Sequence, residues 1–339
     1  VNVAFQEIQV TFVSASRAQV AWVVTAYNII FASLLVGGGR TADLLGRRRV
    51  FMAGAGVFAL GSAVCAVSRT LPVLIAGRAA QGLGAAFLMP ATLGLLLAAF
   101  PPERRTQIVS LWGGVGALGV ASGPTLGALL ISVAGWRAAF WINLPICAAV
   151  LIAGRRILSE TPRAVNAHRP DYLGAAMITA GLAALALGIS QSDEWGWTSA
   201  RTLGSLALAA IVTPFFIRRQ ARHAAPVLDL TLFRQRPFAL ANVATMLFGI
   251  GFAAALLNNV LFLRTVWGYT ILQAGLAAFM APVVVAIVSG PAGRLAARIG
   301  FRPLLVVGPL VVALGWAISA TQFESRPNLA WWFIALVAT

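Results

Sequence analysis

Long apolar runs separated by short arginine-bearing stretches constrain this chain more than any other feature. Of its 339 residues, 60% are hydrophobic and only 10% are charged, whereas about a quarter of the residues of a soluble domain are charged. A membrane-spanning helix needs about 20 mostly apolar residues, and such runs recur along the whole chain. The sequence therefore predicts an all-α integral membrane protein.

Charges and Pro or Gly clusters delimit twelve apolar segments. We expect the first and last to be partial spans of a chain truncated at both ends, because it starts at Val1 without a methionine and stops at Thr339 within an apolar run. The predicted segments are residues 1–8, 18–38, 50–67, 72–99, 108–132, 138–154, 172–190, 202–217, 238–263, 272–292, 303–320 and 329–339.

The arginines predict the orientation of these spans. All 25 basic residues are arginine, and alternate loops hold 18 of them against 6 in the opposite loops. Because cytoplasmic loops retain positive charge, we expect the arginine-rich loops on the cytoplasmic side of the plasma (inner) membrane. The net charge of +16 does not indicate nucleic-acid binding, since the arginines are dispersed between apolar runs.

Several kinds of chemistry have no support in the sequence. Cys65 and Cys147 lie inside apolar runs, where a thiol is usually a small core residue, so neither a disulfide framework nor a metal site is predicted. There is no Walker sequence and hence no expected ATP motor. We expect no cofactor and no enzymatic activity.

The most charged stretch, from Gly39 to Arg49, has a second copy. Residues 293–302 match residues 39–48 at two glycines, two arginines and an alanine, which predicts two related halves. We therefore expect an N-terminal helical bundle at 1–158, a linker with two extra transmembrane helices at 159–222, and a C-terminal bundle at 223–339. A solvated basic loop that only sets topology is the alternative explanation of the stretch.

Arg78 is the most informative single residue, because it lies well inside a predicted span. A guanidinium there costs several kcal/mol unless it faces a cavity or a partner. Gln81 lies three residues further on, hence on the same helix face, and Gly82 and Gly84 permit close approach of a neighbour. The alternative is an arginine that snorkels to the membrane edge or braces two helices.

The span at 108–132 carries glycines at intervals of four. Gly119, Gly123 and Gly127 share one smooth face on which a second helix can pack. Pro124 removes an amide hydrogen and weakens the helix there. The sequence predicts close packing of a bent helix, and ordinary small-residue packing explains any one glycine.

Other candidates are weaker. Trp112, Asn258 and Asn259 are candidates for an apolar substrate cavity, although helix packing explains them equally well. All nine carboxylates lie at span ends or in loops. A membrane-embedded acid that titrates during proton coupling is therefore not visible in the spans.

These motifs together resemble the major facilitator superfamily and, within it, the fourteen-span drug:proton antiporters. Residues 39–48 resemble the family's loop signature between spans 2 and 3, residues 78–86 its span 4 motif, and residues 119–128 its span 5 antiporter motif. Residues 136–145 and the Pro170–Gly174 entry to the extra span pair are also similar. Thr41, Leu44, Ala128 and Ala297 depart from the family pattern.

The resemblance implies two pseudo-symmetric six-helix bundles, with two extra spans between them, that rock about a central cavity while protons drive substrate out. It implies proton coupling by Arg78 and Gln81 through an acidic partner, a span 1 aspartate whose position would precede Val1. It implies a seal against proton leak along the antiporter motif of Gly119, Gly123, Pro124 and Gly127. A cytoplasmic latch is implied at Gly39, Asp43, Gly46, Arg47 and Arg48.

Three functions remain open at this point. The first is proton-coupled export of amphipathic drugs or antibiotics by a monomer. The second is a transporter of the same fold for a physiological metabolite, and the third is a fragment or scaffold that does not transport. The expected partners are a small amphipathic substrate, protons and the lipid bilayer.

Overall fold

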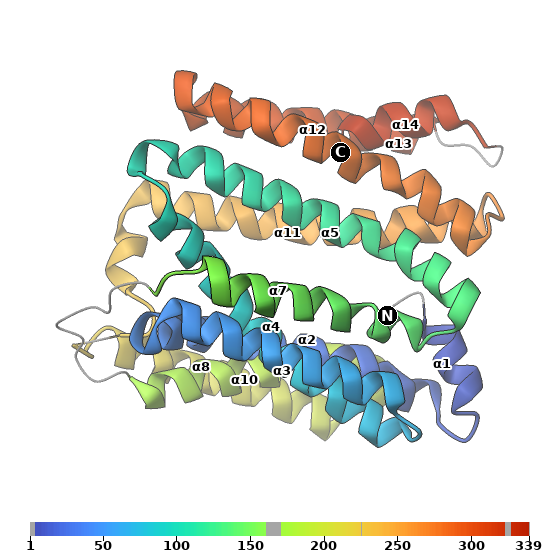
Figure 1. Cartoon of the computed structure of the whole chain (residues 1–339), viewed down its shortest axis with the longest axis horizontal. Coiled ribbons are helices and arrows are strands. Elements are labelled where there is room, and N and C mark those ends of the chain that lie inside the picture. The colour runs from blue at the N-terminus through green and yellow to red at the C-terminus, as the bar shows by residue number, and fades with distance from the viewer. Residues whose placement is uncertain (1–3, 161–170, 225, 323–326, 339) are drawn as a thin grey trace. The chain divides into compact units, whose positions relative to one another are not determined.

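A computed structural model describes residues 4–160, 171–224, 226–322 and 327–338 (Figure 1). Within these ranges, eight helices are long and apolar enough to cross a membrane. The expectation of an all-helical, multi-pass membrane protein is confirmed. The predicted total of twelve segments stays a prediction, and Arg163, Arg169 and Pro170 lie outside the described residues.

The helices lie close to the predicted segments. The helix bounds are α1 Phe5–Thr11, α2 Arg17–Leu45, α3 Arg47–Val67, α4 Leu71–Ala99, α5 Arg105–Ala134, α6 Ala138–Trp141, α7 Asn143–Ile157, α8 Tyr172–Ser190, α9 Ser192–Trp195, α10 Ala200–Gln220, α11 Arg236–Thr265, α12 Ile271–Ile299, α13 Phe301–Gln322 and α14 Leu329–Ala338. Short 3-10 turns occupy Pro102–Arg104 and Leu230–Arg234.

Most helices run beyond the predicted apolar segments. The α2 helix continues seven residues past the predicted end at residue 38, because a helix can extend through charged residues where the membrane ends. The predicted segment 138–154 is two helices, α6 and α7, separated at Ile142. Apolarity therefore locates the membrane-embedded part of a helix rather than its ends.

The chain forms two compact units. The first comprises Val1–Ala98 and Ala134–Ala241, and the second comprises Ala99–Val133 and Asn242–Thr339. Packing thus groups α5 with the later helices. The division into bundles at 1–158 and 223–339 concerns the two sequence-related halves, and it stays a prediction.

Glycines bring α4 of the first unit unusually close to its neighbours. A Cβ built on Gly82 would lie 2.7 Å from the Tyr27 carbonyl oxygen of α2. On the other side, a Cβ on Gly84 would lie 2.7 Å from the Gly54 carbonyl oxygen of α3. Such backbone contact is how small residues hold membrane helices together. The predicted close approach at Gly82 and Gly84 is thus present, and α4 packs against both α2 and α3.

A buried carboxylate joins the two ends of the α8–α10 hairpin. Asp171 caps α8 by accepting a 2.8 Å hydrogen bond from the Gly174 amide. Its oxygens also accept 2.7 Å and 2.9 Å hydrogen bonds from Arg219 Nε and Gln220 Nε2 at the end of α10. Burial alone raises the pKa of Asp171, but these hydrogen bonds outweigh burial and hold the pKa below its ordinary value. The clamp therefore favours the ionised carboxylate, and its contribution to stability is lost as the pH falls through this lowered pKa.

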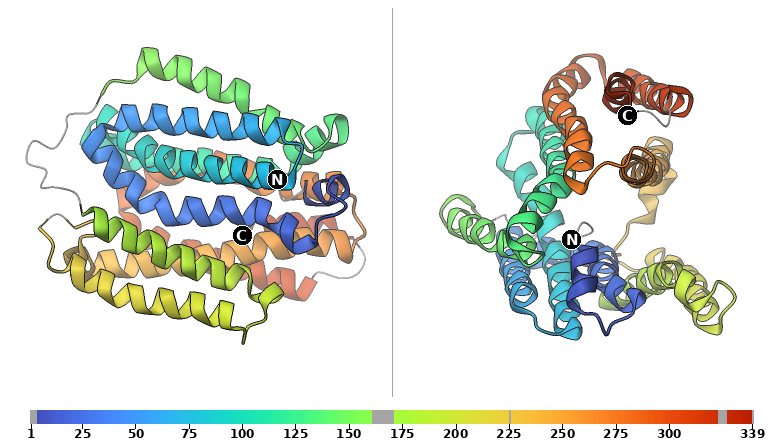
Figure 2. Two further views of the ribbon diagram at one scale, coloured as in Figure 1. Left: turned by 90° about the horizontal axis from the view of Figure 1, so that it is seen from below. Right: turned by 90° about the vertical axis from the view of Figure 1, so that its right-hand side faces the viewer.

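The same hairpin is attached to α2 (Figure 2). The Thr25 and Ser190 hydroxyl oxygens lie 3.1 Å apart, and Thr179 donates a 3.0 Å hydrogen bond to the Ser33 carbonyl. Because these contacts lie two turns apart along α2, they fix the register of α8 against it.

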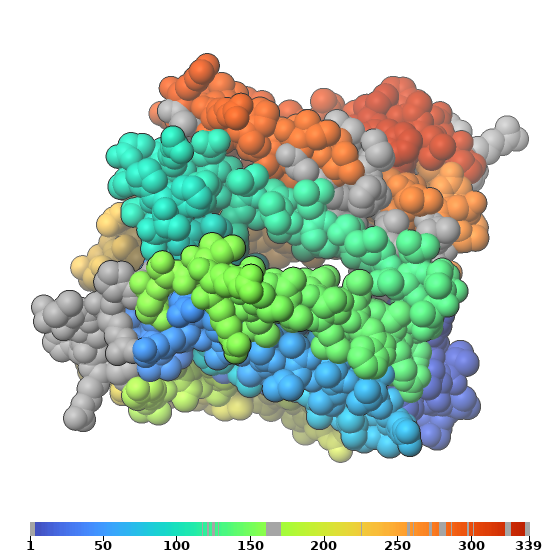
Figure 3. Space-filling model, in the orientation of Figure 1, coloured from blue at the N-terminus to red at the C-terminus, as the bar shows by residue number. Residues whose placement is uncertain are grey.

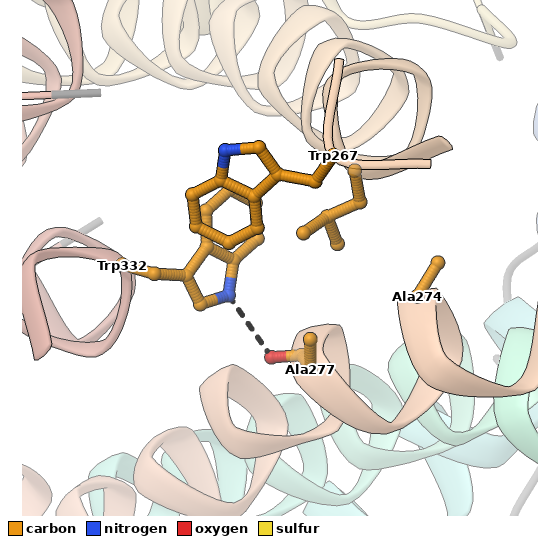
Figure 4. Packing of buried hydrophobic residues seen from close by; sticks show 5 residues of the cluster. Trp267, Ala274, Ala277 and Trp332 are labelled. Carbon is orange, nitrogen blue, oxygen red and sulfur yellow. Dashed lines mark hydrogen bonds between the residues drawn. The ribbon is translucent and has the colours of Figure 1, made fainter. Parts of the chain in front are cut away.

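The second unit contains an aromatic cluster at one end of α11 and α12 (Figure 4). The Trp267 and Trp332 ring centroids lie 5.5 Å apart, and the Trp332 indole donates a 3.2 Å hydrogen bond to the Ala277 carbonyl. The buried indole N–H thus has its partner, and α14 is held to α12.

A pair of glycine substitutions tests the Asp171 clamp. A Cβ on Gly174 would overlap Asp171 Oδ2 and Gln220 Nε2, so Gly174→Ala is expected to lower the melting temperature of the purified protein by several degrees. The matched change Gly204→Ala adds a methyl group where no described atom lies within 4 Å. It should leave stability unchanged or raise it by up to about 1 kcal/mol. Equal melting temperatures for the two variants would contradict the clamp.

Candidate functional site

Arg78 of α4 is buried among polar groups of the first unit. Only 7% of its surface is exposed. Its Nε donates a 2.8 Å hydrogen bond to the Val23 carbonyl of α2, and its Nη1 donates one of 2.8 Å to Gln81 Oε1. Its Cζ atom lies 4.2 Å from the centroid of the Tyr27 ring. Arg78 and Gln81 thus share one helix face, as their spacing predicts, and they are also hydrogen bonded.

The polar contacts extend from Gln81 to two further helices. Gln81 Nε2 donates a 2.6 Å hydrogen bond to Ser62 Oγ of α3. Ser62 Oγ also accepts a 3.3 Å hydrogen bond from Asn143 at the start of α7. We call Arg78, Gln81, Ser62 and Asn143 the Arg78 network. It joins α2, α3, α4 and α7 inside the membrane-spanning region.

The contacts described for the Arg78 guanidinium include no carboxylate. Among the contacts of the described residues, the guanidinium faces a carbonyl, an amide oxygen and an aromatic ring, and no carboxylate. A carbonyl and a π face both attract a cation, although neither neutralises its charge. The site is therefore electropositive and braces α2 against α4, so the bracing alternative also describes what Arg78 does.

The stretch from Gly39 to Arg49 is not a loop, contrary to our expectation. Gly39 to Leu45 complete α2, and Arg47 starts α3, so only Gly46 separates the helices. Gly46 has φ 104°, in the region that favours glycine. The matching Gly300 separates α12 from α13 with φ 82°. Both copies therefore make the same sharp helix-to-helix turn.

Arg47 connects three helices at this turn. Its Nε and Nη2 donate 3.0 Å and 2.9 Å hydrogen bonds to Asp43 Oδ1 on α2, and its Nη1 donates a 2.9 Å bond to the Gly94 carbonyl of α4. Two of the predicted latch residues, Asp43 and Arg47, are thus paired. Gly39 packs on α4, because a Cβ there would lie 3.4 Å from Pro90.

Glu160 is a residue of this turn that the sequence analysis missed. Its carboxylate accepts 3.1 Å and 3.3 Å hydrogen bonds from the backbone amides of Arg48 and Arg49. A Cβ on Gly46 would lie 2.6 Å from Glu160 Oε1. A carboxylate at this position satisfies free amides and complements the helix dipole. No local pattern indicated it, since the cap comes from more than a hundred residues away.

The close packing of α5 lies outside the three glycines of the antiporter motif. A Cβ on Gly114 would lie 2.7 Å from Ser289 Oγ of α12, and one on Gly293 would lie 3.0 Å from Ser110. At Gly119, Gly123 and Gly127, a built Cβ would meet no described atom within 4 Å. The close approach of α5, at Ser110 and Gly114, therefore precedes the predicted face in the helix. The side chain of Pro124 lies outside the described part, and a bend there stays a prediction.

The candidate cavity residues are not brought together by a described hydrogen bond. Trp112 is half-buried on α5, Asn259 is half-buried on α11, and Asn258 is exposed. All three belong to the second unit. Their contribution to a substrate cavity stays a prediction.

A family model described as Major Facilitator Superfamily matches residues 1–339. The chain belongs to this superfamily of transporters. The fold agrees, since the crystal structure of the human organic anion transporter MFSD10 (TETRAN) matches 98% of the chain and 72% of its own length with a TM-score of 0.57 at 18% identity.

Three curated relatives are resistance proteins. The chain is 36% identical over 318 residues to the multidrug resistance protein Stp of Mycobacterium tuberculosis, and 32% over 327 residues to the tetracenomycin C resistance and export protein of Streptomyces glaucescens. These matches cover 93% and 95% of the chain but 58% and 60% of the relatives. The methylenomycin A resistance protein of Bacillus subtilis is 33% identical over 99% of the chain and 72% of its own length.

Removing the carboxylate of Glu160 tests its role as the α3 cap. Glu160→Ala is expected to reduce the free energy of unfolding by about 1–2 kcal/mol, the usual cost of a lost helix cap, as measured by thermal denaturation in detergent. Ser159→Ala alters the neighbouring exposed residue and should leave stability within about 0.5 kcal/mol. A loss no greater for Glu160→Ala than for Ser159→Ala would exclude the cap.

Proposed function

We propose that this protein exports amphipathic drugs or antibiotics across the cell membrane by proton-coupled, alternating-access antiport. The proposal includes the fourteen-span architecture, with two six-helix bundles and α8 and α10 as the extra pair. The observation that carries it is the buried Arg78 network in a transporter related to resistance and export proteins. The cytoplasmic location of the arginine-rich turns is part of the same proposal.

In this mechanism Arg78 and Gln81 act on proton binding. A cation in a low-dielectric site favours the charged form of any acid that approaches it, and so lowers the proton affinity of that acid. The guanidinium is held by the Val23 carbonyl and by Gln81 at 2.8 Å each, which fixes its position. An acid that moves toward Arg78 would release its proton, and one that moves away would bind a proton.

The glycine-containing motifs at the α2–α3 turn and on α5 have different roles in this proposal. Gly39, Asp43, Gly46, Arg47 and Arg48 hold the cytoplasmic ends of α2, α3 and α4, and latch the bundles when that side is closed. Gly119, Gly123, Pro124 and Gly127 give α5 a smooth face that seals against proton leak. Trp112, Asn258 and Asn259 contribute to the substrate cavity.

Changing Arg78 separates proton coupling from transport itself. In everted vesicles, we expect Arg78→Ala to abolish ethidium accumulation driven by a pH gradient. Arg78→Lys keeps a charge but cannot reproduce the fork of hydrogen bonds, and should reduce gradient-driven accumulation at least tenfold while retaining downhill counterflow.

Arg201→Ala, which removes an exposed arginine, serves as the control for this experiment and should transport normally. Expression and melting temperature show whether each variant is folded. Wild-type gradient-driven transport by folded Arg78→Ala would overturn the role given to Arg78. Gradient-independent exchange of a metabolite by the wild-type protein, without ethidium transport, would favour the metabolite transporter.

Asp43 distinguishes a latch from a loop that only sets topology. The second copy of the motif has Ala297 where the first has Asp43, so the ion pair with Arg47 has no counterpart there. Asp43→Asn is expected to lower the transport rate about tenfold, whereas Ala297→Ser should change it less than twofold. Equal effects on rate at equal expression would contradict the asymmetric latch.

A further inference from the structure

Four arginines gather where α3 begins and α7 ends. We call Arg48, Arg49, Arg155 and Arg156 the α3–α7 junction. Arg48 Nη2 donates a 3.1 Å hydrogen bond to the Arg155 carbonyl, which places the two helix ends together. The Nε atom of Arg48 is buried and has no hydrogen-bond partner among the described residues. Arg155 and Arg156 are exposed.

The nearby carboxylates leave this positive charge largely uncompensated. Glu160 directs its oxygens to the amides of Arg48 and Arg49, and its ion pair with the Arg49 guanidinium is a long 3.8 Å. Asp43 is paired with Arg47 at 2.9 Å. The helix N-terminus is thus already occupied by a protein carboxylate, so the guanidinium groups are what remains to attract an anion.

The junction adjoins an apolar surface of the kind that lipid covers. Near the end of α7, Ile152 precedes the two arginines and is 57% exposed. The space-filling view shows α7 lying along α3 on the outer surface of the first unit (Figure 3). An exposed isoleucine one turn before Arg156 matches the order of groups in a phospholipid, from acyl chain to headgroup.

We propose that the α3–α7 junction binds the headgroup of an anionic phospholipid. Guanidinium groups form charge-assisted hydrogen bonds with phosphate oxygens, and the exposed Arg155 and Arg156 present such groups at the surface. The acyl chains lie along the part of α7 that carries Ile152. Arg48 belongs both to this junction and to the latch proposed above, whereas Arg155 and Arg156 belong to the junction alone, so lipid binding can be tested without changing the latch.

Lipid retention tests the site directly. The purified protein would be placed in nanodiscs of phosphatidylcholine with graded phosphatidylglycerol, and the affinity for phosphatidylglycerol measured by the rise in melting temperature and by native mass spectrometry. Arg155→Gln combined with Arg156→Gln leaves the Arg155 carbonyl and the Glu160 cap in place. Each arginine at a membrane surface contributes about 1 kcal/mol, or about fivefold in affinity, so the double variant should bind phosphatidylglycerol at least tenfold more weakly.

A matched variant separates a site from general surface charge. Arg218→Gln combined with Arg222→Gln removes two exposed arginines from the end of α10 and the residues after it, and should leave the affinity nearly unchanged. Equal losses in the two double variants would overturn the proposal, as would an unaltered affinity in the junction variant. Stabilisation by glycerol phosphate in detergent, equal to that by phosphatidylglycerol, would overturn the lipid assignment and indicate a site for a free phosphate.

Discussion

The burial of one positive charge dictates how the helices of the first unit pack. A guanidinium inside a membrane helix is costly unless the protein supplies what water would have supplied. Arg78 can reach the Val23 carbonyl at 2.8 Å only if α2 lies against α4. That approach requires Gly82, because a Cβ there would lie 2.7 Å from the Tyr27 carbonyl. Arg78 and Gly82 are therefore two parts of a single requirement.

The packing of α3 against α4 likewise depends on a buried polar group and on small residues at the contact. Gln81 satisfies Arg78 with its amide oxygen, which leaves its amide nitrogen to be satisfied in turn. Ser62 provides that acceptor at 2.6 Å, and the distance is short enough because Gly61 and Gly84 let α3 approach. A Cβ on Gly61 would lie 2.8 Å from the backbone nitrogen of Gln81. Each polar group thus requires a small residue on the neighbouring helix.

What the sequence predicted well was governed by local pattern. Apolar length located the spans, and the spacing of Arg78 and Gln81 placed both on one helix face. The repeat related residues 39–48 to 293–302, and the structure gives Gly46 and Gly300 equivalent positive φ angles of 104° and 82°. In each case the deciding information lay within about one turn of helix or within one matched stretch.

What the sequence did not predict depends on contacts between distant segments. Glu160 caps α3 across 112 residues of chain, and Ser62 and Asn143 join the Arg78 network from two other helices. The turn at Gly46 was expected to be a loop because four arginines were assigned to solvent, yet helices continue through charged residues once they leave the membrane. Charge marks where the membrane ends rather than where the helix ends.

The two helix-to-helix turns also differ in a way that bears on mechanism. Three side chains stabilise the turn at Gly46. Arg47 binds both Asp43 of α2 and the Gly94 carbonyl of α4, and Glu160 caps α3. At Gly300 the sequence has Ala297 in place of the acid, so that turn lacks the equivalent of the Asp43–Arg47 pair. Two turns with the same backbone but different polar contacts will not resist bending equally. If the proposed closure uses both turns, its specificity comes from the first, where charges with fixed partners define one geometry.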